Sequence, residues 1–217
     1  MDLLPFIRCG TLAHGHLCPP LVLGTRAGAA AMERLGVGRA VERELLAIVE
    51  LGSDHYAQGF ADGVQFVTGC TFGKELIFRL PHGKAGVQLV DQARDRAVRV
   101  TVRPETIGRL EETEWFRACQ SSGQFANGSD QLAGPTADAL LSVPEDSLFT
   151  FSPVFPLGLD RPSPTFESVR CDSCGESVLA PYAPVIDGQR LCAVCQERSR
   201  ARAEFISQHR SDGPIKE

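Results

Sequence analysis

The sequence predicts an α+β core, a mixed helix and antiparallel-sheet domain, joined to a small module that folds around a metal. Segments typical of strands and of helices are mixed in the core without the strict alternation of βαβ folds. Two CxxC pairs follow a proline-rich break at residues 161–165, which is typical of an extended linker. We therefore predict a core over residues 1–160, a linker over 161–167, and over 168–217 a zinc-finger module of the ribbon or treble-clef kind with a C-terminal helix or tail.

The sequence of the first half of the core predicts a helix, a strand and a second helix. A helix is expected over residues 21–35, because two prolines suit its first turn and Gly36 can end it. Small residues give this helix a face that another backbone can approach closely: Gly24, Ala27, Gly28 and Ala31. Residues 45–51 form an apolar run of strand length. Residues 60–67 favour a helix.

The second half adds three strands and two helices. We expect residues 76–80 and 87–90 to pair with each other across a turn. Residues 97–103 alternate between apolar and polar side chains, which is typical of a half-buried strand. A single helix is predicted from Pro104 through Cys119, and a short one over residues 136–141.

The charge balance limits the classes of partner. Lys and Arg number 22 against 27 acidic residues, a net charge of −5, so general coating of nucleic acid is excluded, since that binding depends on neutralising phosphates. No apolar run approaches the roughly 18 residues of a membrane helix. The first residues also lack the basic start and apolar stretch of a secretory signal. We expect a cytoplasmic protein without a membrane partner.

Four cysteines near the C-terminus form a metal-binding pattern. Cys171 and Cys174, then Cys192 and Cys195, are two CxxC pairs separated by seventeen residues. Two such pairs supply the closed tetrahedral shell of a structural zinc site. Redox dithiols and rubredoxin-like iron are the alternatives. A closed shell has no position for a substrate, so we expect the module to fold around zinc and to contact a partner protein.

Three arginines that follow the last cysteine pair are candidates for binding nucleic acid. Arg198, Arg200 and Arg202 could contact phosphates, but Glu197 and Glu204 lie close to them in the sequence. A solvated helix face is the favoured interpretation, and nucleic acid is the less favoured partner.

A second set of soft ligands lies near the N-terminus. His14, His16 and Cys18 occupy alternate positions, so in an extended segment they would point to one side. Cys18 precedes the predicted helix, and a helix N-terminus favours the negative charge of a thiolate. Imidazoles with a thiolate suit zinc, iron, nickel or copper(I) better than magnesium or calcium. The alternative is one packed histidine with two incidental neighbours.

A glycine-rich segment, residues 69–74, contains the next candidate. Cys70 lies between glycines, and we expect an exposed turn there. Lys74 could hold Cys70 as a thiolate or bind an anionic ligand. The alternative is that Cys70 is a small buried residue, as we expect of Cys9 and Cys119.

These motifs together resemble the FmdE family, named for the E component of formylmethanofuran dehydrogenase. The resemblance rests on residues 14–19, 23–28, 69–74 and 83–85, and residues 168–197 resemble a zinc-finger extension of some members. It implies an α+β core that forms an intertwined homodimer, with a pocket lined by the histidine and cysteine segments. It also implies a link to molybdenum or tungsten formylmethanofuran dehydrogenase metabolism.

The resemblance further implies a set of site residues. The candidates for catalysis are His14, His16, Cys18, Asp62, Cys70, Lys74 and Lys84. Lys74 and Lys84 would bind an anionic cofactor or substrate. Many members have a cysteine where this chain has Gly59, three residues before Asp62, and His55 lies near enough in the sequence to substitute for it.

Three functions follow as alternatives. The first is a metal- or cofactor-handling protein, whether enzyme or not, in which His16, Cys18 and Cys70 hold a second transition metal and His14 is a further ligand or orients one. The second is a regulatory or adaptor module, in which the zinc finger contacts protein or nucleic acid and the core senses a metal or ligand. The third is thiol redox chemistry between Cys18 and Cys70.

Overall fold

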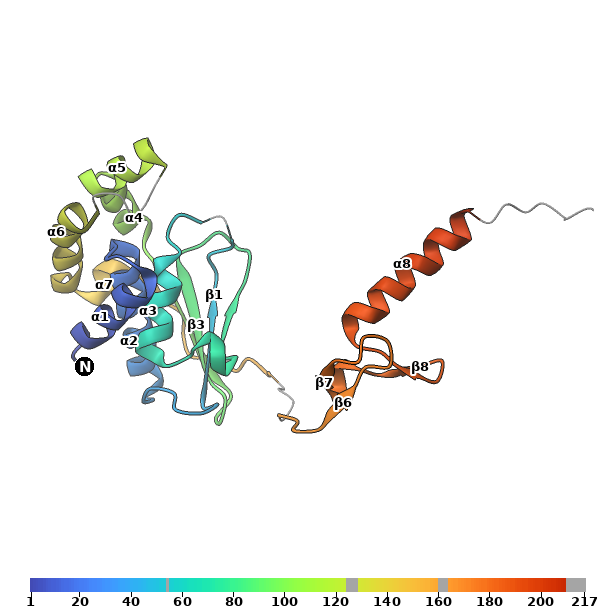
Figure 1. Ribbon diagram of the computed structural model, residues 1–217. Helices are drawn as coiled ribbons and strands as arrows, with labels where there is room; N and C mark the ends of the chain where they lie inside the picture. The colour runs from blue at the N-terminus through green and yellow to red at the C-terminus, as the bar shows by residue number, and fades with distance from the viewer. Residues whose placement is uncertain (54, 124–128, 160–163, 210–217) are drawn as a thin grey trace, which may run out of the picture. The chain divides into compact units, whose positions relative to one another are not determined.

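The computed structural model describes residues 1–53, 55–123, 129–159 and 164–209 (Figure 1). The chain forms two compact units, Met1–Leu159 and Asp160–Glu217. A mixed helix and sheet core and a four-cysteine module confirm the predicted fold class. Residues 161–163 of the predicted linker lie outside the described residues. Among the described residues, no helix combines the length and the apolar composition that a bilayer crossing requires.

The core sheet has five strands in the order β2-β1-β3-β4-β5. They are β1 (Leu45–Val49), β2 (Ile77–Arg79), β3 (Gly86–Asp91), β4 (Arg96–Val102) and β5 (Phe149–Phe151). β1 pairs with β2 in parallel, and the other pairs are antiparallel. The predicted direct pairing of residues 76–80 with 87–90 is therefore wrong, because β1 lies between the two strands. Burial explains this: β1 and β3 are almost fully buried and must be central, whereas β2 is largely exposed and can lie at the edge.

A buried carboxylate, that of Glu50, directly follows β1. Glu50 is 1% exposed, and it accepts hydrogen bonds from Arg99 Nε at 2.7 Å and Gln88 Nε2 at 2.9 Å. The Arg99 guanidinium holds the pKa of this carboxyl below its usual range. These bonds fix the start of the loop that runs from residue 51 to α3.

Two helices pack on the sheet, α2 (Pro19–Leu35) on β3 and β4, and α3 (Gly59–Thr68) on β1. Both were predicted, and α2 ends at Gly36 in the left-handed conformation, with φ 62°. α2 and α3 touch along their backbones. A Cβ atom on Gly24 would overlap the carbonyl of Phe60, and one on Gly63 would overlap that of Leu21. The small-residue face of α2 thus admits another backbone, as expected.

α2 and α3 run in the same direction along their contact. Gly59 lies against Cys18 at the start of both helices, and Gly28 lies against Val67 near the end of α3. The N-termini of α2 and α3 therefore meet at one end of the pair. An unpredicted helix, α1 (Leu4–His14), packs on α3 and leads the chain to that end.

Four further helices complete the described part of the core: α4 (Pro104–Glu111), α5 (Glu114–Ser122), α6 (Ser129–Ser142) and α7 (Glu145–Leu148). The predicted single helix from Pro104 through Cys119 is wrong. Thr113 adopts an extended conformation and caps α5, since its hydroxyl accepts a hydrogen bond from the Phe116 N–H at 3.2 Å. The short helix predicted over residues 136–141 is the second half of α6, which contains Pro135.

Over its described residues, 164–209, the second unit has two hairpins followed by one α-helix. β6 (Ser168–Arg170) pairs with β7 (Ser177–Leu179), β8 (Val185–Ile186) pairs with β9 (Gln189–Arg190), and α8 (Ala193–His209) follows. Its buried cluster consists of Cys171, Cys192 and Cys195, with Val178 and Leu191 packed against them. Two 3₁₀ turns, Phe72–Lys74 in the core and Ala180–Tyr182 here, complete the elements.

Candidate functional site

Three metal-capable side chains converge where α1 ends and α2 begins. Atoms of His14, His16 and Cys18 that could ligate a metal lie within 4.8 Å of one another. His14 is the last residue of α1, and Cys18 directly precedes α2. The expected extended segment is therefore wrong at His14. A left-handed turn at Gly15, with φ 94°, ends α1 and brings the side chains together instead.

His14 is oriented by a carboxylate from another helix. Its Nδ1 lies 2.8 Å from Oδ2 of Asp62 on α3. Hydrogen bonds with Asp62 and with Cys18 raise the pKa of His14 to about 10, so the metal-free ring is cationic near neutral pH. With Nδ1–H directed at Asp62, Nε2 is the atom left for a metal, which is the usual carboxylate–histidine–metal arrangement.

Gly59 lies directly against this cluster. A Cβ atom at position 59 would lie 2.6 Å from Cys18 Sγ and 3.2 Å from His14 Nε2. A cysteine here would thus bring a sulfur into the cluster, whereas glycine supplies no ligand. Within the described residues, three metal-capable side chains therefore meet at this point.

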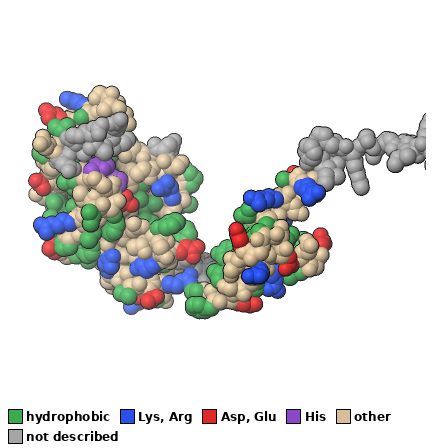
Figure 2. Space-filling view, in the orientation of Figure 1, with side chains coloured by type: hydrophobic (Ala, Val, Ile, Leu, Met, Phe, Trp, Pro, Cys, Tyr) green, Lys and Arg blue, Asp and Glu red, His purple; other side chains and the backbone are tan. Residues whose placement is uncertain are grey.

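A cavity of about 290 Å³ adjoins the three ligands. Its walls come from the loop after β1, from α2, and from α5; besides the cluster they include Pro20, Ser53, His55, Tyr56, Gln58, Gly59 and Trp115. Figure 2 shows histidine side chains reaching the surface of the core at one place. The structure brings His55 to this cavity, where its Nδ1 accepts a hydrogen bond from the Ala57 N–H at 3.0 Å.

Sequence reasoning did not assign Ser53, Tyr56, Gln58 or Trp115 to the site. Tyr56 and Gln58 carried no signal, because they belong to a loop without a motif. Trp115 is 1% exposed, and its place on the cavity depends on the packing of α5 beside the N-terminus of α2.

Cys70 lies away from the cluster. It follows the C-terminus of α3, a helix of ten residues and thus about 15 Å long, whose other end contacts Cys18. Cys70 is fully buried, and burial raises its pKa. The expected exposed turn is wrong because Gly69 packs against the backbone of Ala40. Cys70 therefore does not join His16 and Cys18 as a ligand, and a redox pair with Cys18, which needs Cα atoms within about 7 Å, is excluded.

The two predicted anion-binding lysines also lie outside the cavity lining. The Lys74 ammonium donates to the carbonyls of Ala40 at 3.1 Å and Val41 at 3.3 Å. Lys84 is exposed in the loop between β2 and β3, and its backbone N–H donates to the Glu50 carbonyl at 2.9 Å. Lys74 therefore holds a loop in place, and neither lysine faces the three ligands.

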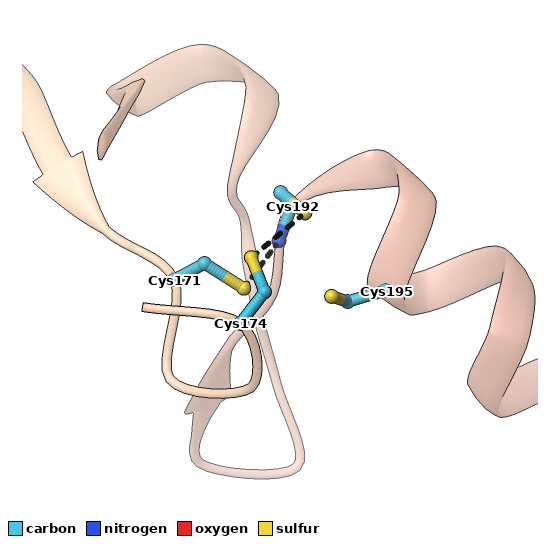
Figure 3. A group of neighbouring side chains, drawn as sticks. All are labelled: Cys171, Cys174, Cys192 and Cys195. Atoms are coloured by element: carbon cyan, nitrogen blue, oxygen red, sulfur yellow. Dashed lines mark hydrogen bonds between the residues drawn. The ribbon is translucent and has the colours of Figure 1, made fainter. Parts of the chain in front are cut away.

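The second unit forms the other cluster (Figure 3). Ligand atoms of Cys171, Cys174, Cys192 and Cys195 lie within 4.8 Å of one another. Cys192 N–H donates to Cys171 Sγ at 3.3 Å, and Cys174 Sγ lies 3.9 Å from Cys192 Sγ. Backbone N–H groups of Cys174 and Cys192 lower the pKa of Cys171 to about 6, which favours the thiolate that zinc binds.

Two family profiles match the chain, one over each unit. The profile described as "FmdE, Molybdenum formylmethanofuran dehydrogenase operon" matches residues 13–150. The profile described as "Prokaryotic dksA/traR C4-type zinc finger" matches residues 164–201. The first range contains the core cluster and its cavity, and the second contains all four cysteines. The four-cysteine cluster is thus that of a zinc finger.

Similar proteins include one curated relative and one solved structure. A protein of Archaeoglobus fulgidus named "Probable S-adenosyl-L-methionine-binding protein" is 34% identical over 194 residues, which cover 84% of this chain and 50% of the relative. The chain thus spans about half the length of that relative. The crystal structure of a tungsten formylmethanofuran dehydrogenase FmdE-like protein from Syntrophus aciditrophicus superposes with a TM-score of 0.60 at 23% identity, covering 92% of this chain and 94% of that one. This second likeness concerns the fold.

Proposed function

The chain belongs to the FmdE family, and on that premise we propose that its core binds one transition-metal ion through His14, His16 and Cys18. The observation that carries the proposal is the approach of their ligand atoms to within 4.8 Å. Two imidazoles and a thiolate suit zinc and the softer transition metals. The bond between His14 and Asp62 supports the proposal, because it holds the ring with Nε2 toward the cluster.

Three protein ligands beside a cavity are typical of a reactive site rather than a structural one. A metal with an open position supplies Lewis-acid activation of what binds there. The protein's part is to orient His14 through Asp62, to keep position 59 clear of a side chain, and to shape the cavity with the loop after β1 and Trp115.

Cys18→Ser tests the core metal. The native chain should carry two metal ions, one in the core and one in the finger, and the variant should carry one by elemental analysis of the dialysed protein. Cys9→Ser is the matched control, since Cys9 is exposed and lies outside both clusters; it should keep two. A native chain with a single metal, or a Cys18→Ser chain with two, would contradict the proposal.

We propose a second function for the zinc finger, which is contact with a partner protein. Apolar side chains of this small unit are exposed: Tyr182 by 62%, Val185 by 60% and Val194 by 55%. Deleting residues 165–217 should abolish partner capture and leave metal binding by the core intact. Loss of core metal in the truncated chain would count against independent units.

Two wider proposals come from the family. The description of its profile supports a link to molybdenum formylmethanofuran dehydrogenase metabolism. A homodimer is supported by the exposed edge strand β2 and by Phe72, which is 84% exposed beside it. Light scattering of the full chain tests that oligomeric state.

A further inference from the structure

β2 has a backbone edge that no strand of the described residues covers. In the core sheet its one neighbour is β1. The Leu76 carbonyl and the Leu80 N–H each form a hydrogen bond of 2.8 Å to the backbone of β1. Because the N–H and C=O groups of successive strand residues point to alternate sides, those of Ile77 and Arg79 face away from β1. Such an edge is a template for pairing with another chain.

The residues on either side of β2 limit how another strand can pair with it. The Glu75 N–H already donates to the Phe72 carbonyl at 2.8 Å, and Glu75 has φ 55°, outside the extended region. Pro81 has no N–H to donate. The edge therefore offers four backbone groups, the N–H and C=O of Ile77 and those of Arg79.

We infer that a second copy of this chain pairs its own β2 with this edge, antiparallel and with the two-fold axis at Phe78. The inference rests on the proposed homodimer and names its interface. In this register Ile77 of one copy and Arg79 of the other exchange both backbone hydrogen bonds, and the axis repeats the exchange, so all four groups of each copy are paired. An axis at Ile77 would place Glu75 opposite Arg79, and an axis at Arg79 would place Pro81 opposite Ile77. Either of these would leave backbone groups unpaired.

An exposed aromatic side chain lies where this axis passes. Phe78 is 39% exposed, and the alternation of a strand places it on the opposite face of the sheet from Ile77 and Arg79. At the axis the two copies of Phe78 form a non-hydrogen-bonded pair, in which side chains approach most closely. Aromatic cross-strand pairs of this kind are stabilising, so the same register also covers this ring.

The groove between α3 and β2 suits an arginine of the second copy. The side chains that line it include the carboxylates of Asp62 and Glu75 and the guanidinium of Arg79. In the inferred register Arg79 of the second copy lies opposite Ile77, at this groove and near the ring of Phe72, which is 84% exposed. Carboxylates and an aromatic face both attract a guanidinium. Each copy supplies one arginine and receives one, as a two-fold interface requires.

Ile77→Pro tests the backbone pairing, with Ile77→Val as the matched control. The Ile77 N–H faces away from β1, so proline should leave that pairing intact and remove one intermolecular hydrogen bond from each copy. Sedimentation velocity of the full chain over a dilution series should show a native dimer, with a dissociation constant raised at least about tenfold in Ile77→Pro. Ile77→Val keeps the N–H and should dimerise as the native chain does.

Phe78→Cys tests the position of the axis. The two introduced thiols would face each other across it, where Cα atoms lie about 4.5 Å apart, within the range of a disulfide. With oxidised glutathione as the oxidant, the variant should form a disulfide-linked dimer on a non-reducing gel. The native chain and Phe72→Cys are the controls and should remain mostly single chains, since neither the exposed Cys9 nor position 72 lies at the axis.

The outcomes separate this interface from the homodimer itself. An unchanged dissociation constant in Ile77→Pro, or a folded, dimeric Phe78→Cys chain that does not cross-link, would overturn this interface and leave a homodimer formed through another surface. A native chain that is monomeric throughout the dilution series would overturn the homodimer and this inference together, and would leave the edge to a strand of another protein. Where Ile77→Pro does not fold, the cross-link of Phe78→Cys decides alone.

Discussion

The two clusters of soft ligands in this chain are built in opposite ways. In the finger, four sulfurs come from two local CxxC turns and surround a single point. In the core, three metal-capable side chains come from residues 14–18, and residues from other elements orient and enclose them: Asp62 and Gly59 from α3, and Trp115 from α5. The finger needs little beyond its own sequence to make a site, whereas the core site depends on the tertiary structure.

Burial shows what each cluster does for its unit. The buried cluster of the finger consists of three of its cysteines with two partly buried apolar neighbours, which is too little apolar surface to hold a fold. The core has a continuous hydrophobic cluster that joins the sheet to α1, α2, α5 and α6. In the finger the metal makes the fold, whereas in the core the fold brings three metal-capable side chains together.

Removing the finger metal should give the largest effect. Cys171→Ser should unfold the second unit, because a structural zinc contributes on the order of 10 kcal/mol to such a fold. The thermal unfolding midpoint of the core should stay unchanged. Heteronuclear NMR follows the two units separately: the dispersed signals of residues 168–209 should be lost, and those of the core should be retained. The comparison fails if the finger signals remain dispersed in Cys171→Ser, or if the core signals are lost as well.

The same difference explains what the sequence could predict. The four-cysteine cluster of the finger was predicted because its ligands are set by local spacing. α2 was predicted because proline, glycine and a small-residue face mark it locally. The pairing of β2 with β1 was missed, since a short strand carries no sign of its partner and only the burial of β1 and β3 decides it.

The core site was predicted in part for the same reason. His14, His16 and Cys18 lie within five residues, so their convergence needed only a turn. Cys70 was placed wrongly, because its position depends on the parallel packing of α3 on α2, which separates it from Cys18 by the length of a helix. Tyr56, Gln58 and Trp115 come from distant segments, and no local pattern marks them.

A smaller effect should follow from adding one methyl group at Gly59. In Gly59→Ala the new Cβ atom would lie 2.6 Å from Cys18 Sγ and 3.2 Å from His14 Nε2, so the two ligands must move apart. We expect loss of the core metal, retention of the finger metal, and destabilisation of the core by about 1–3 kcal/mol. Elemental analysis and thermal unfolding measure these effects.

Gly108→Ala is the matched control for this substitution. Gly108 lies inside α4, and a Cβ atom there meets open space. Alanine should stabilise that helix by about 0.5–1 kcal/mol and leave both metals in place. A Gly59→Ala chain that retains two metals would show that the core cluster does not depend on close packing between α2 and α3.

The smallest effect is a change in proton release. Because the pKa of His14 is raised to about 10, chiefly by Asp62, metal binding at pH 8 must displace a proton from His14. In Asp62→Asn the pKa should fall toward its usual value near 6.5, the ring should already be neutral at pH 8, and binding should release about one proton fewer. Calorimetry in buffers of different ionisation enthalpy counts these protons.

Asp172→Asn is the control for this substitution. Asp172 lies in the finger, where it accepts a hydrogen bond from the Arg190 N–H at 2.7 Å, so Asp172→Asn should leave the number of protons released at the core unchanged. If the native and Asp62→Asn chains release equal numbers of protons, Asp62 does not control the protonation of His14. The core cluster would then differ from the finger cluster only in its packing against other elements.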